Sequence, residues 1–96
     1  MRIYLPHLNY TLKVKKFKVC AEMPNALAWV EHTDSNTCTL YLDKKYTPGD
    51  LAHELVHVLQ FIALDRNLRF ELEQEHFGYM MQYFMGEILG YEWKTT

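Results

Sequence analysis

The chain has 96 residues, of which 49% are hydrophobic, 15% aromatic and 23% charged, and its formal net charge is -2. This composition excludes an intrinsically disordered chain and predicts one compact domain over residues 1–96. The near-neutral charge argues against a nucleic-acid-binding protein, which would need clustered lysine and arginine. No apolar run reaches the roughly 18 residues that a membrane span requires.

Two isolated cysteines, Cys20 and Cys38, are too few for a disulfide framework or a cysteine-rich zinc site. No secretory signal is recognised at the start of the sequence, because Pro6 and His7 interrupt it. We therefore expect a cytoplasmic protein, a monomer or a small homo-oligomer, with no nucleic-acid or membrane partner.

The first half of the chain has the residue pattern of β-strands. The segment RIYL at residues 2–5 and the alternating segment YTLKVKKFKV at residues 10–19 each predict a strand. ALAWVEHT and TCTLYLD, which flank the polar residues 34–36, predict a hairpin. We expect a small antiparallel sheet of three to four strands, with the lysines of residues 13–19 on a solvated face.

The second half of the chain predicts two helices. Thr47 is placed to cap a helix that starts at Pro48, and Asp50 lies three residues after the cap. This helix is expected to end near Leu64. A second helix is expected over residues 68–89, because apolar residues recur there at spacings of three, four or seven. Two antiparallel helices packed on one face of a sheet define an α+β fold.

The first predicted helix carries a stripe of ionisable residues. His53, Glu54 and His57 share one side of it with Asp50, while apolar residues form the opposite side. Two histidines one turn apart can bind the same cation, and Glu54 is placed to take a proton from a water beside that cation. A solvated helix face is the plain alternative. It is disfavoured because the flanking sequence is apolar, and ionisable groups in a buried helix need partners.

The motif His-Glu-x-x-His resembles the signature of the zincin metallopeptidases, which implies a zinc cofactor, a peptide or protein substrate and peptide hydrolysis as the activity. The metzincin branch is excluded. Its pattern requires glycine at position 60 and histidine at position 63, where this chain has Gln60 and Ala63. The chain is more similar to the gluzincins, whose third zinc ligand is a glutamate on the next helix.

Three glutamates on the second predicted helix are candidates for that ligand: Glu71, Glu73 and Glu75. If this helix is antiparallel to the first and begins at residue 68, the residue level with the histidines lies near 75–77, which favours Glu75. Glu75 also matches the ligand position of ImmA/IrrE-type metallopeptidases, although His76 replaces the small residue that usually follows. Glu71 and His76 are kept as alternative ligands, the latter as in SprT-like zincins.

The resemblance also implies the other parts of the site. Tyr79, one turn beyond Glu75, resembles the phenols that stabilise the oxyanion in zincins. By size the chain looks most like the minigluzincins, which implies that TCTLYLD is the edge strand beside the cleft, where an extended peptide would be added. The alternative is a catalytically weak or inactive zincin-like protein that acts as a binding module. In that case the fourth metal position would be filled by one of three groups: His7, His32 or Cys38.

Overall fold

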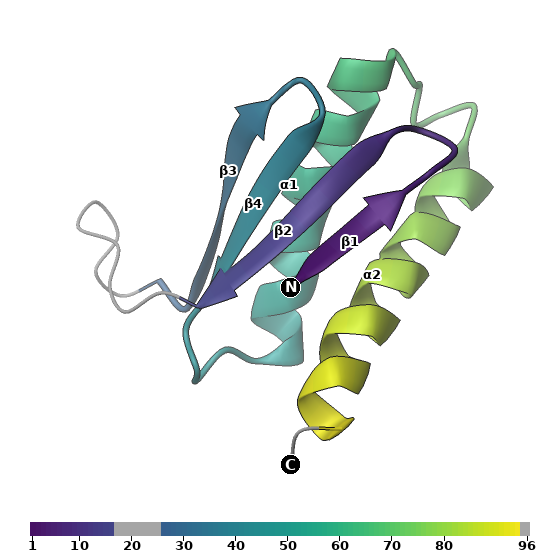
Figure 1. The fold of residues 1–96 in the computed structure, drawn as a ribbon. Helices are drawn as coiled ribbons and strands as arrows, with labels where there is room; N and C mark the ends of the chain where they lie inside the picture. The colour runs from purple at the N-terminus through teal and green to yellow at the C-terminus, as the bar shows by residue number, and fades with distance from the viewer. Residues whose placement is uncertain (17–25, 95–96) are drawn as a thin grey trace.

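A four-stranded sheet lies against two helices in the computed structural model, which describes residues 1–16 and 26–94 (Figure 1). The strands are β1 (Arg2–Leu5), β2 (Tyr10–Lys16), β3 (Ala28–Asp34) and β4 (Thr37–Leu42), and the helices are α1 (Pro48–Arg66) and α2 (Gln74–Lys94). The α+β class is confirmed. Cys20 and the last part of the lysine-rich segment lie outside the described residues. Neither of the two helices, as far as they are described, is long and apolar enough to cross a membrane.

The sheet is mixed, which corrects the expectation of a wholly antiparallel one. The strand order is β1-β2-β4-β3, and the β1–β2 and β3–β4 pairs are antiparallel, but β2 and β4 are parallel. After β2, the chain forms β3 at the outer edge of the sheet and then turns back as β4, which lies between β2 and β3. β4 is therefore antiparallel to β3 and parallel to β2. The edge strand next to α1 is therefore β3, and the segment TCTLYLD forms the inner strand β4.

Both helices cover the same face of the sheet (Figure 1). Alternate strand residues point into the core from this sheet face, including Ile3, Leu5, Leu12, Leu40 and Leu42. The helices supply the other half of the core: Leu51, Leu55, Val58 and Ile62 from α1, and Phe77, Met80, Phe84 and Ile88 from α2. Because the apolar side of α1 packs against the sheet, the ionisable stripe of this helix faces β3 and solvent.

Local capping determines where α1 begins, as predicted. The Thr47 hydroxyl accepts the N–H of Asp50, and the Asp50 carboxylate accepts the N–H of Thr47, which completes a capping box ahead of Pro48. The helix ends at Arg66, where Asn67 takes the left-handed conformation with a φ of 54° and donates its N–H to the carbonyl of Ala63.

The second helix begins six residues later than predicted, at Gln74 instead of residue 68. The Arg69 carbonyl accepts the N–H groups of Leu72 and Glu73, so the chain turns in this region before it becomes helical. Phe70 stacks on Phe77 with 4.0 Å between ring centroids. Its helical spacing in the sequence therefore reflects packing from a connecting segment onto α2, and not a continuous helix.

Arg66, the last residue of α1, ties the helix to both hairpin turns. Its guanidinium donates to the carbonyls of Leu8 at 2.7 Å and Asn9 at 2.9 Å, in the β1–β2 turn. It also donates to the Ser35 carbonyl at 2.8 Å and to the Asn36 side chain at 2.6 Å, in the β3–β4 turn. One planar side chain thus fixes three segments at one end of the sheet.

We expect Arg66→Lys to lower the free energy of unfolding by about 2 kcal/mol, because a lysine keeps the charge but cannot reach both turns at once. Urea denaturation followed by circular dichroism measures the change. Arg69→Lys is the matched control. Arg69 is exposed, with an exposed Glu71 partner, so its replacement should cost less than about 0.5 kcal/mol. Equal losses for the two variants would contradict the role assigned to Arg66.

Candidate functional site

His53 and His57 lie one turn apart on α1, and their rings meet edge to face. The ring centroids are 5.2 Å apart and the ring planes are inclined by 74°. Zinc accepts an imidazole nitrogen at about 2.0 to 2.1 Å, so two rings this close can share an ion only if a nitrogen of each turns toward it. His53 is exposed and His57 is half-buried. Two of the three predicted ligands are therefore neighbours in the structure.

A hydrogen bond to Gln60 orients the second of these histidines. Nδ1–H of His57 donates to Oε1 of Gln60 at 3.2 Å, which leaves the lone pair of Nε2 free. Histidines that bind metals are commonly held in this way by an acceptor on the other ring nitrogen. Gln60 is not among the predicted site residues, but its spacing of three residues from His57 on a helix is a signal in the sequence for this contact.

Glu54 lies on the same stripe and is half-buried. Burial raises the pKa of its carboxyl group above the ordinary range, His57 and then His53 act in the opposite direction, and the Asp50 carboxylate adds to the rise. A hollow of about 240 Å³ lies beside it, lined by Asp50, His53, Glu54 and residues 26–28. A carboxylate whose pKa is raised is a better proton acceptor, so Glu54 is suited to act as a general base.

The stripe continues along α1 to Asp65, where it meets the sheet. One oxygen of Asp65 accepts hydrogen bonds from the Tyr10 hydroxyl and from Nε2 of His32, both at 2.7 Å. His32 also stacks on Phe61, with 4.6 Å between ring centroids. The thiol of Cys38 lies 3.2 Å from the Tyr10 hydroxyl, and burial raises the pKa of this thiol to about 11. His32 and Cys38 therefore belong to a structural network and not to the histidine pair.

Glu75, the predicted third ligand, does not lie beside the histidines. It is in the first turn of α2, which follows the end of α1 only after the connecting residues 67–73, and His57 lies nine residues before that end. Among residues 1–16 and 26–94, no three histidine, cysteine, aspartate or glutamate side chains are close enough to hold one ion. The described residues thus fit two protein ligands for zinc and do not fit the third.

The other candidates also lie elsewhere. Glu71 is exposed; its own backbone N–H and the Arg69 guanidinium lower the pKa of its carboxyl group. His76 meets His7, with 2.9 Å between their Nε2 atoms. Tyr79 is 66% exposed and lines the same cavity as His7 and His76, next to β1. Since β1 and β3 are opposite edges of the sheet, the structure separates Tyr79 from the ionisable stripe of α1.

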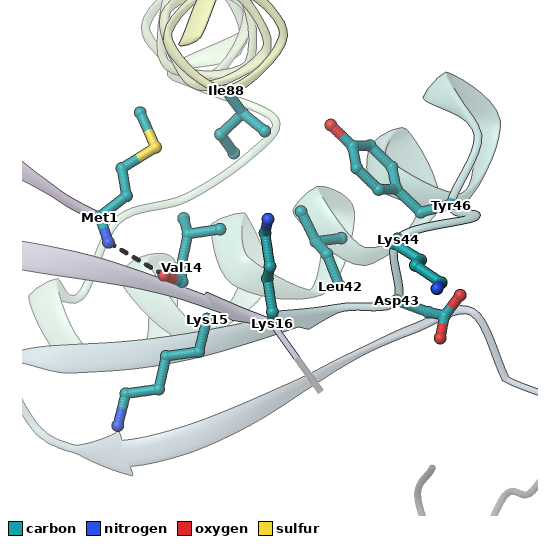
Figure 2. Close-up of a pocket in the computed structure, with 9 residues that line it drawn as sticks. All are labelled: Met1, Val14, Lys15, Lys16, Leu42, Asp43, Lys44, Tyr46 and Ile88. Atoms are coloured by element: carbon teal, nitrogen blue, oxygen red, sulfur yellow. Dashed lines mark hydrogen bonds between the residues drawn. The ribbon is translucent and has the colours of Figure 1, made fainter. Parts of the chain in front are cut away.

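A further cavity of about 260 Å³ lies between the ends of β2 and β4 and the helix α2 (Figure 2). Figure 2 shows Lys16 extending toward Ile88, while Lys15 points away from the cavity. The lining contains no histidine, and Asp43 is its one carboxylate. This cavity lacks the residues for metal chemistry, so the stripe on α1 is the better candidate for a catalytic site.

Comparisons of the chain with protein-family models, with curated proteins and with solved structures find no match. The interpretation of the site therefore depends on its own residues. These are two histidine rings one helical turn apart, an acceptor that orients one of the two rings, and a partly desolvated carboxylate beside them.

In metal-free protein at neutral pH, we expect Glu54→Gln to raise the melting temperature. The pKa of the Glu54 carboxyl group is higher in the folded protein than in the unfolded chain. Its contribution to the free energy of unfolding is therefore fully present below the unfolded-state pKa and is lost as the pH rises through the folded-state pKa. A neutral glutamine at this position avoids that loss.

Thermal unfolding of the two proteins at pH 4 and pH 7, with a chelator present, measures this difference. The stabilisation by Glu54→Gln should be larger at pH 7 than at pH 4. Glu87→Gln, at an exposed position of α2, is the control and should show little pH-dependent difference. A stabilisation that is the same at both pH values would mean that desolvation of Glu54 is not its cause.

Proposed function

We propose that this protein is a zinc-dependent peptidase in which His53 and His57 bind the ion and Glu54 is the general base. The proposal is carried by the edge-to-face geometry of the two rings, together with the hydrogen bond that orients His57. When bound, a zinc ion supplies Lewis-acid chemistry, because it activates a water and polarises the carbonyl of a peptide bond.

Glu54 performs the proton transfers in this proposal. Its carboxylate accepts the proton of the attacking water and then delivers it to the nitrogen of the leaving amine. Partial burial and the nearby Asp50 raise the proton affinity of Glu54, as this role requires. The hollow beside Glu54 and Ala28 offers space for the scissile bond.

An extended peptide is the substrate class that suits the surroundings of the stripe. β3 is an edge strand, and among the described strands it pairs only with β4. The backbone groups on its outer side can pair with a peptide that adds to the sheet as a further strand. Ala28, Val30 and His32 pair with the buried residues of β4 and share the face toward α1. A peptide along β3 would therefore run beside the stripe.

The alternative function is a binding module that is catalytically weak or inactive. The observation in its favour is that no third ligand lies with His53 and His57 among the described residues. Such a protein would use the edge of β3 to bind an extended peptide without cleaving it. Peptide binding without turnover, by protein loaded with zinc, would favour this alternative.

We expect His57→Ala to remove one equivalent of bound zinc, and Glu54→Gln to retain zinc but to lose at least about 10²-fold in the rate of peptide hydrolysis. Mass spectrometry of the native protein gives the metal content, and cleavage of an unstructured protein such as casein gives the activity. Glu87→Gln is the matched control, since Glu87 is an exposed glutamate on the other helix. Full proteolysis by the Glu54→Gln protein would exclude Glu54 as the base.

Glu75→Ala tests the third ligand separately. Because Glu75 does not lie with His53 and His57 in a group that could hold one ion, we expect the substitution to change the free energy of zinc binding at the histidine pair by less than about 0.5 kcal/mol. Calorimetric titration with zinc measures the affinity, and Glu71→Ala is the control. A large loss of affinity in Glu75→Ala alone would show that metal binding draws the start of α2 toward His57.

A further inference from the structure

A second pair of histidines lies near the β1 edge, on the opposite side of the molecule from His53 and His57. His7 is in the β1–β2 turn and His76 is in the first turn of α2, and their Nε2 atoms are 2.9 Å apart. Their ring centroids are 5.1 Å apart, nearly the same separation as in the pair on α1. The two residues are 69 positions apart in the sequence, so only the tertiary fold brings them together.

The β1–β2 turn that carries His7 is held in place without help from His7. The hydroxyl of Tyr4 donates to the side chain of Asn9 at 2.9 Å. Arg66 donates to the backbone carbonyls of Leu8 and Asn9 in the same turn. On the other side, α2 is anchored by its buried core face. The two imidazoles are therefore preorganised, and a ligand between them requires no rearrangement of the backbone.

Glu73 lies beside His76, with 3.7 Å between its Oε1 and Nδ1 of His76, and a carboxylate on this side favours the tautomer of His76 that carries its proton on Nδ1. In that tautomer the Nε2 lone pair of His76 faces His7, and Nε2 of His7 is the donor of the 2.9 Å contact. When an ion enters, the proton of His7 moves to its Nδ1, and both imidazoles bind through Nε2 in the neutral form. No net proton is released by this exchange.

We propose that His7 and His76 form a second binding site, for a divalent transition-metal ion of the class that prefers imidazole nitrogen, such as Zn²⁺. Two nitrogen ligands of a tetrahedral ion lie about 3.3 Å apart, so a small rotation of the exposed His7 ring is sufficient to admit the ion. The adjacent cavity of about 340 Å³, lined in part by Tyr4, Tyr79 and Tyr83, gives room for water at the remaining positions.

An ion at this site crosslinks the sheet to α2, because one ligand belongs to the β1–β2 turn and the other to the helix. It therefore stabilises the folded protein, and above the dissociation constant this stabilisation increases with the logarithm of the free ion concentration. With two protein ligands it binds less tightly than a site with three.

The test uses the full chain with His53→Ala and His57→Ala, which removes the first pair. Titration calorimetry with zinc chloride should show one bound equivalent, and the melting temperature should rise with zinc concentration. The further substitution His7→Gln should abolish both effects, while a Gln82→Ala control, at an exposed position of α2, should leave both unchanged. Circular dichroism verifies that each variant is folded.

If the His53→Ala, His57→Ala protein does not fold, the same question is answered by stoichiometry: His7→Gln in the otherwise unchanged chain should reduce bound zinc from two equivalents to one. The proposal is overturned if the folded His53→Ala, His57→Ala protein binds no zinc, or if its zinc binding survives both His7→Gln and His76→Gln. Zinc binding by a chain with His7→Gln and His76→Gln reports the first pair alone, so this proposal and the peptidase proposal can fail separately.

Discussion

The packing of α1 against the sheet determines where the ionisable stripe of this protein lies. Four side chains of one face of this helix are completely buried: Leu51, Leu55, Val58 and Ile62. Burial of each contributes about 1.5 to 3 kcal/mol, so rotating α1 to turn its ionisable stripe inward would cost several kcal/mol. The core thus holds His53, Glu54 and His57 at the edge of β3, where a carboxylate can be partly desolvated and still reach water.

Features that depend on neighbouring residues could be predicted from the sequence. The cap at Thr47 and the proline after it determine the start of α1, because both act within one helical turn. RIYL forms β1 over the predicted residues, and the polar residues 34–36 lie where the β3–β4 hairpin turns. The pairing of His53 with His57 is also local, since residues four apart on a helix are always neighbours.

Features that depend on distant contacts could not be predicted. The parallel pairing of β2 with β4 follows from the position that β3 takes in the sheet, which no local pattern encodes. The predicted start of α2 is wrong because Phe70 has helical spacing in the sequence but packs on Phe77 from outside the helix. That difference of six residues separates Glu75 from the histidines. The contacts of His7 with His76 and of His32 with Asp65 likewise join segments that the sequence keeps apart.

The contacts of Arg66 also bear on the order in which the molecule folds. They join residues between 30 and 58 positions apart, so the intervening loops must close before the guanidinium finds its acceptors. Closure of such loops is entropically unfavourable, and contacts of this kind form late on the folding pathway. We therefore expect the Arg66 contacts to lower the unfolding rate of the native protein and to contribute little to its folding rate.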